Sequence, residues 1–145
     1  MTRAKRMKPV QKLVDENERR LAQSLAAGER KVTEAEGKLQ ELERYRSEYE
    51  KQFSQRAGRG IGAVDLRDYQ VFLARLAEAI RQQQAIVQRA RAERDAERLR
   101  WQEAAKRAKA LGHVVEQWQT EERRMFERRE QHESDERAQR KVNRP

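Results

Sequence analysis

Large apolar side chains recur along this chain at alternating intervals of three and four residues, which is the spacing of a coiled-coil seam. One stripe runs from Met7 to Phe53, and a second runs from Leu66 to Met125. Between the stripes lie the clustered glycines Gly58, Gly60 and Gly62. The pattern therefore predicts two long helices joined by a short turn.

The glycine cluster predicts a hairpin turn, because glycine adopts positive φ without steric cost and destabilises a helix interior. Pro9 is suited to a first helical turn, and Asp65 is suited to an N-cap. The expected fold is all-α: a long antiparallel two-helix coiled coil, or α-hairpin, with the second helix overhanging the first. Its expected parts are a basic segment at 1–8, helix 1 at 9–56, a turn at 57–64 containing Gly58, Gly60, Ile61 and Gly62, helix 2 at 65–138, and a basic tail at 139–145.

Closing the hairpin at the glycines pairs the two stripes. The expected facing pairs are Phe53 with Leu66, Tyr49 with Tyr69, Leu42 with Leu76, Gly28 with Ala90, and Glu18 with Trp101. Because the second helix is longer, its overhang is expected to begin near Leu111. The overhang would leave without an intramolecular partner the residues Val115, Trp118, Met125 and Phe126.

Composition supports a narrow buried stripe over a globular core. Charged residues make up 41% of the chain and apolar residues 36%, which is too few to wrap a compact core. The chain has no cysteine, so no disulfide framework or thiolate metal site is expected. No secretory signal or transmembrane segment is expected either. The net charge of +9 favours an acidic partner, such as nucleic acid, an anionic membrane or an acidic protein.

No residue pattern indicates catalysis. His113 and His132 have no second ligand at metal spacing, and the serines have no nearby histidine base. The glycine cluster does not match a phosphate-binding loop, because Gly60 is followed by Ile61 and a helix comes before the turn. We therefore expect no enzyme activity, no catalytic residue, no metal and no cofactor.

Near the turn the apolar stripe is wider than a seam requires. Tyr45, Phe72 and Ala79 flank seam positions there. The extra width has two interpretations: it thickens the contact between the helices, or it binds a partner. The candidate patch consists of Leu42, Tyr45, Tyr49, Phe72, Leu76 and Ala79.

The chain ends are basic, and hairpin closure would place them away from the turn. This charge either keeps the protein in solution or, with the nearby aromatic residues, binds a partner. The candidate end surface consists of Arg3, Lys5, Arg6, Lys8, Trp118, Met125, Phe126, Arg137, Arg140 and Lys141.

The residues around the turn resemble the FliJ family, the small coiled-coil proteins of the bacterial flagellar type III export apparatus. The resemblance rests on Tyr45-x-x-x-Tyr49, Gly58-x-Gly60-Ile61, Tyr69-Gln70-x-Phe72 and Leu76-x-x-Ala79-Ile80. It covers about forty residues letter by letter, and the rest of the chain agrees in pattern. Lys38 and Gln83 lie at the edge of the patch and depart from the family pattern.

The resemblance implies a non-enzymatic stalk whose terminal end enters the export ATPase ring and promotes its assembly and activity. It also implies that the turn-proximal patch binds the cytoplasmic part of an export gate membrane protein, and that export chaperones are partners. The implied location is cytoplasmic, peripheral to the inner membrane at the flagellar basal body, and the free protein is expected to be a monomer. The alternatives are a generic coiled-coil scaffold or homodimer and a basic nucleic-acid-binding coiled coil; interleaved acidic residues argue against nucleic acid as a partner.

Overall fold

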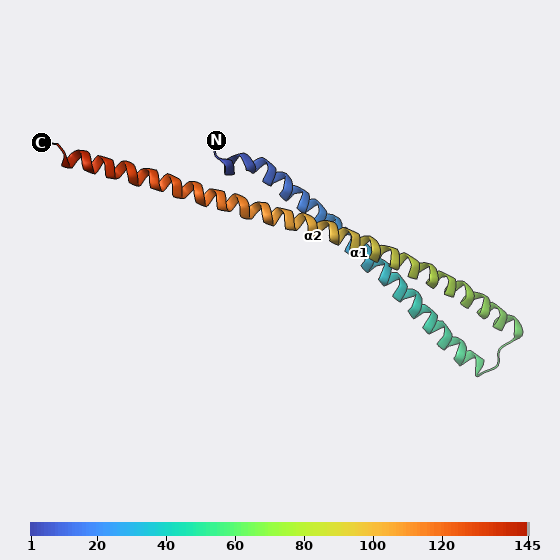
Figure 1. The fold of residues 1–145 in the computed structure, drawn as a ribbon. Helices are drawn as coiled ribbons and strands as arrows, with labels where there is room; N and C mark the ends of the chain where they lie inside the picture. Colours follow the sequence, from blue (N-terminus) through green and yellow to red (C-terminus); the bar gives the residue numbers. More distant parts are fainter. Residues whose placement is uncertain (145) are drawn as a thin grey trace. The chain divides into compact units, whose positions relative to one another are not determined.

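The computed structural model describes residues 1–144. It consists of two helices, α1 (Arg3–Ala57) and α2 (Ala63–Val142), joined by a turn at residues 58–62 (Figure 1). No strand is present within residues 1–144. The two helices pack against each other, which confirms the expected all-α hairpin.

The chain divides into two compact units, and each is described separately. One unit is Leu21–Arg100, which contains the turn. The other combines Met1–Arg20 with the chain from Trp101 onward. We call them the turn unit and the terminal unit.

The turn unit has a narrow apolar seam. Its buried side chains are Val32, Ala35, Leu76, Ile80 and Val87. They come from the two predicted stripes, so burial follows the heptad pattern.

One buried side chain of this seam is polar. Gln83 is 9% exposed, and its Nε2 donates a 3.0 Å hydrogen bond to the main-chain oxygen of Ala35. Because the bond satisfies the buried amide, Gln83 can sit in the seam and fix the pairing of the helices.

Two facing pairs of the turn unit differ from the expectation. Phe53 stacks on Tyr69 with ring centroids 3.4 Å apart, and Leu66, its expected partner, is 43% exposed. Gly28 lies against the backbone of Arg94, whose Cα would be 3.6 Å from an added Cβ, instead of opposite Ala90. Both shifts pair the α1 residue with a position three or four residues farther along α2, which is one turn of the helix.

The turn is tighter than the predicted 57–64. The main-chain N–H of Gly60 donates to the Ala57 oxygen at 3.2 Å, and Gly60 has φ of +90°. The Gly62 main-chain oxygen accepts a hydrogen bond from the Leu66 N–H at 3.1 Å, so Gly62 is the N-cap residue of α2. Asp65, expected as the N-cap, lies in the first turn of α2, where its carboxylate still complements the helix dipole.

In the terminal unit α1 begins at Arg3, not at Pro9 as predicted. The Thr2 hydroxyl accepts the Lys5 N–H at 3.3 Å, and a Glu122 carboxylate oxygen accepts the Ala4 N–H at 3.2 Å. These two acceptors satisfy donors of the first turn, so the helix starts upstream of the proline. Pro9 therefore lies within α1, where it supplies no N–H to the helix.

The longer α1 covers part of the predicted overhang. Val115 is 2% exposed, and the Arg3 guanidinium carbon lies 4.1 Å from the centroid of the Trp118 ring. The expectation that Val115 and Trp118 have no partner within the chain is therefore wrong. From residue 123 to residue 144 every side chain is exposed, and α2 continues to Val142 rather than ending at residue 138.

Candidate functional site

Five aromatic rings near the turn form one cluster that alternates between the helices. Phe53 stacks on Tyr69, and Tyr69 stacks on Tyr49 with centroids 5.4 Å apart. Tyr49 lies 4.4 Å from Phe72, and Phe72 meets Tyr45 edge to face at 5.8 Å. We call these five residues the aromatic cluster. Ring pairs of this kind stabilise a contact beyond the area they bury, so the cluster ties the two helices together near the turn.

The residues of the predicted turn-proximal patch are not equally accessible. Leu76 is 6% exposed, so it belongs to the seam. Tyr45 is 50% exposed and presents the largest free apolar surface of the set. Four members are half-buried: Leu42, Tyr49, Phe72 and Ala79. A partner at this patch would therefore meet Tyr45 first, with Phe72 and Ala79 beside it.

Tyr69 is an ionisable member of the aromatic cluster, and its surroundings shift its pKa. Burial raises the pKa of the Tyr69 phenol, and the carboxylate of Glu50 and the neighbouring Tyr49 raise it further. All three effects disfavour a phenolate at this position. The hydroxyl is therefore a neutral hydrogen-bonding group at physiological pH.

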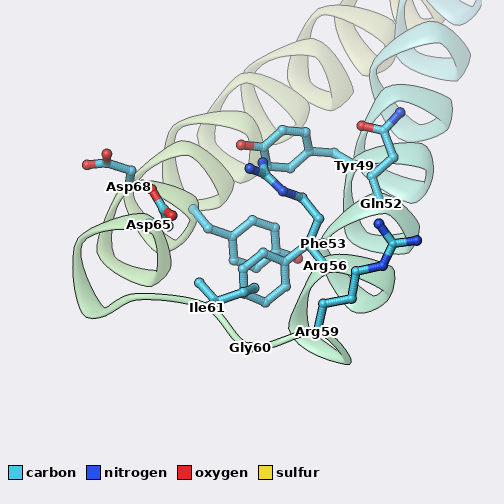
Figure 2. A pocket seen from close by; sticks show the side chains of 10 residues that line it. Tyr49, Gln52, Phe53, Arg56, Arg59, Gly60, Ile61, Asp65 and Asp68 are labelled. Carbon is cyan, nitrogen blue, oxygen red and sulfur yellow. The ribbon is translucent and has the colours of Figure 1, made fainter.

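A cavity of about 310 Å³ opens beside the cluster at the turn (Figure 2). Phe53 and Ile61 lie between two charged sides: the α1 side carries a basic residue, Arg56, and the α2 side carries Asp65 and Asp68 (Figure 2). Within residues 1–144, none of these charged side chains forms an ion pair. The arrangement offers exposed charged side chains around an apolar floor.

The predicted end surface separates into two parts in the terminal unit. Arg3 stacks on Trp118 and forms a 3.2 Å salt bridge with Glu121. Arg137 and Lys141 lie farther along α2, about 24 Å or more from Glu121 at 1.5 Å per residue. The structure therefore brings Arg3 onto Trp118 but does not bring the two basic clusters together. The predicted members that are exposed are Arg3, Lys5, Arg6, Lys8, Met125, Phe126, Arg137, Arg140 and Lys141, whereas Trp118 is half-buried.

Residues 123–142 of α2 form an exposed helical segment, which we call the α2 extension. Met125 is 54% exposed and Phe126 is 62% exposed. No α1 side chain covers this part of α2, since α1 begins beside Trp118 and Glu122. A helix with exposed large apolar residues and arginines has the composition of a contact surface.

The histidines and acidic residues show no catalytic arrangement. His113 is exposed, and the His132 Nε2 lies 3.2 Å from a Glu136 carboxylate oxygen one helical turn away. Within residues 1–144 no group of three or more His, Asp or Glu side chains is placed to hold a metal ion. Neither helix, over the same residues, has a stretch long and apolar enough to cross a membrane.

Sequence reasoning missed two groups of residues. Thr2 and Glu122 cap α1, and Thr2 carried a signal, because threonine before a helical pattern is a favoured N-cap. Ile86 is 49% exposed and continues the apolar spacing of Phe72 and Ala79 by one heptad. The seven-residue repeat was sufficient to find it.

Comparison with protein-family models identifies a family that this chain matches. A family model described as "Flagellar FliJ protein" matches residues 3–145, essentially the whole chain. No curated protein and no solved structure matches the chain.

Proposed function

From the premise that this chain belongs to the FliJ family, and is thus a component of the flagellar type III export apparatus, we propose that it acts as a central stalk of the export ATPase ring. In this role it binds the ring with its terminal unit and promotes the assembly and the ATPase activity of the ring. It binds the export gate with the patch near the turn and also engages export chaperones. It works on the cytoplasmic side of the inner membrane, at the flagellar basal body, and is a monomer when free.

The main support for the proposed ring contact is the exposure of the α2 extension. Exposed large apolar side chains on a helix with no partner in the chain are the usual mark of a protein contact. Met125 and Phe126 occupy adjacent positions at the start of the extension. Basic residues follow toward its end: Arg137, Arg140 and Lys141. Fully desolvated apolar anchors with arginines around them account for most of the binding energy in many interfaces.

The proposed mechanism requires no catalytic group on the stalk. A ligand shifts an equilibrium between ring conformations by its difference in affinity for them. A two-helix stalk presents different side chains on its different faces, so it binds the subunits of a ring unequally. This inequality favours some subunit states over others and thereby changes the rate of ATP hydrolysis.

The test is ATP hydrolysis by the cognate export ATPase, with and without this protein. Wild type is expected to stimulate hydrolysis and to co-sediment with the ATPase. The Met125→Ala, Phe126→Ala double variant is expected to lose about tenfold or more in apparent affinity, since two apolar contacts of about 1 kcal/mol each are removed. Leu99→Ala is the matched control, because Leu99 is 65% exposed and lies in the turn unit. No stimulation and no co-sedimentation by wild type would contradict the ring contact.

A test of the proposed gate contact needs a variant that leaves the packing of the hairpin intact. Leu76 is buried, so Leu76→Ala would weaken the seam as well as the patch. Tyr45→Ala is the sharper probe, because half of the Tyr45 side chain is free. A pull-down with the cytoplasmic part of the gate is expected to weaken with Tyr45→Ala and to persist with Met125→Ala, Phe126→Ala.

The exposed α2 extension also favours a second candidate, a homodimeric scaffold in which two extensions pair. Sedimentation equilibrium across a range of concentrations separates the two functions. A stable dimer that is lost in Met125→Ala, Phe126→Ala would support the scaffold, whereas a monomer supports the stalk.

A further inference from the structure

The two flanks of the seam in the turn unit differ in chemistry. On one flank, Glu36 pairs with Arg91 at 2.9 Å and Glu29 pairs with Arg98 at 3.8 Å. Each helix contributes these residues at seven-residue spacing, so the salt bridges repeat along the seam. We call this side the bridged flank. Interhelical pairs of this kind are what residues beside a coiled-coil seam usually form.

The opposite side, which we call the open flank, lacks such pairs. Within residues 1–144 no ion pair crosses between the helices there. Its residues also repeat every seven positions: Lys31, Lys38 and Tyr45 on α1, and Phe72, Ala79 and Ile86 on α2.

Direct contacts place these residues on one side of the hairpin. At the end near the turn, Tyr45 touches Phe72 at 5.8 Å between ring centroids. Farther from the turn, Lys31, Lys38 and Ile86 line a single groove of about 280 Å³. Because these residues occupy the same heptad positions of the two helices, the aromatic contact and the groove lie on the same flank of the hairpin.

The α2 side of the open flank is apolar, which a two-stranded coiled coil does not require. On α2, Ile86 is 49% exposed, and on α1 the apolar member of the flank, Tyr45, is 50% exposed. Small side chains, Ala35 and Ala90, line the groove between the helices. The groove also includes Gln83, whose amide nitrogen is already bonded to the Ala35 oxygen. A floor with small side chains and a satisfied amide allows another helix to approach closely.

The α1 side of the open flank is cationic. Neither Lys31 nor Lys38 forms an ion pair within residues 1–144. The groove lining also contains Arg89, together with the carboxylates of Glu34 and Glu93, so three cations face two anions. The net charge of the groove is thus positive, and its two lysines are available to a ligand.

We propose that the open flank binds an acidic amphipathic helix of the gate's cytoplasmic part, which packs along the hairpin as a third helix. This inference rests on the proposed gate contact and specifies its partner. Apolar residues of the bound helix, spaced by heptads, cover Phe72, Ala79 and Ile86, a length of about 21 Å. Carboxylates on its other edge face Lys31 and Lys38. The patch near the turn is then one end of a longer binding surface.

The experiment measures binding of the purified cytoplasmic part of the cognate gate by titration at two salt concentrations. The test variants are Lys31→Glu, Lys38→Glu together and Ile86→Ser alone. The matched controls are Lys106→Glu, Lys109→Glu, which makes the same charge change at exposed positions of the terminal unit, and Leu99→Ser. Circular dichroism checks that every variant keeps its helices.

The expected result is a loss of affinity of about tenfold or more for each test variant and less than threefold for each control. The wild-type affinity is also expected to fall with added salt, and that of the double lysine variant to fall less. Equal losses in test and control variants would refute binding at the open flank, because long-range charge attraction alone would explain them. Unchanged binding by the test variants would also refute binding at the open flank, but it would leave the proposed gate contact in place. Absence of binding by wild type would refute both the open-flank proposal and the gate contact. Self-association that is lost only in the test variants would assign the open flank to a second copy of this chain.

Discussion

The main-chain N–H of Ala4 in α1 donates a hydrogen bond to a carboxylate oxygen of Glu122 in α2, with 3.2 Å between the two atoms. The second helix therefore caps the first. An N-terminal helical turn has donors that lack partners within the helix, and here an acidic residue distant in sequence supplies an acceptor. The contact lies beside Arg3, which is held by Trp118 and Glu121.

Replacing Glu122 tests this cap. Glu122→Ala removes the acceptor of the Ala4 N–H, and loss of such a cap costs about 0.5–2 kcal/mol. The first turns of α1 are then expected to fray, so amide hydrogen exchange at residues 4–8 becomes faster. Glu116→Ala is the control, because Glu116 is exposed on α2 and its carboxylate bonds no residue of α1. Equal exchange in wild type and Glu122→Ala would show that the cap does not hold α1.

The sequence predicted the fold because the fold depends on short-range periodicity. The apolar spacing in Met7–Phe53 and Leu66–Met125 specifies the two stripes that pack against each other. The clustered glycines between the stripes specify the position of the turn. The start of α1 was predicted at Pro9 because proline is a strong local signal. At the actual start, Arg3, the first turn is capped by Thr2, which is local in sequence, and by Glu122, whose contact with Ala4 arises only when the two helices lie side by side.

Gly60 is the turn position that requires glycine. Its φ of +90° lies in the region that L side chains rarely adopt. Gly60→Ala is expected to lower the free energy of unfolding by about 1–2 kcal/mol, measured by urea denaturation. Gly58→Ala is the control, because the φ of Gly58 is not positive and an added Cβ there would lie 3.5 Å from its nearest atom, which is ordinary van der Waals contact. A Gly60→Ala protein as stable as the Gly58→Ala protein would contradict this assignment.

The candidate site was predictable in part. Tyr45, Phe72 and Ala79 stood out because they are apolar residues beside a seam, and Tyr45 is indeed half-exposed. Leu76 was expected in the same surface but is buried, since a seam residue and its flanking neighbour look alike in sequence. The pairing of Arg91 with Glu36, which distinguishes the two flanks, depends on the register of the helices and could not be assigned before it was known.

The raised pKa of Tyr69 predicts a pH dependence of stability. The folded protein retains the phenolic proton to a higher pH than an unfolded chain, in which tyrosine titrates near 10.0. The stabilising contribution of Tyr69 is therefore complete below pH 10 and is lost as the pH rises through the raised folded value. Titration of tyrosinate absorbance is expected to show a late component that Tyr69→Phe abolishes. Tyr45→Phe, as the control, retains the late component, and a late component that survives Tyr69→Phe would refute the assignment.

Substitutions at Gly28 test how closely α1 approaches α2 near Arg94. An added Cβ at Gly28 would lie 3.6 Å from the Arg94 Cα, which is ordinary van der Waals contact, whereas one at Gly37 would meet nothing within 4 Å. Alanine at either position is expected to raise stability by up to about 1 kcal/mol, because glycine disfavours a helix interior. Leucine separates the positions: Gly37→Leu is expected to retain the gain, and Gly28→Leu to lose about 1–3 kcal/mol through crowding against the Arg94 backbone. Thermal and urea denaturation of the four variants measure these differences. If Gly28→Leu were as stable as Gly37→Leu, the close approach of α1 to α2 at Arg94 would not exist in solution.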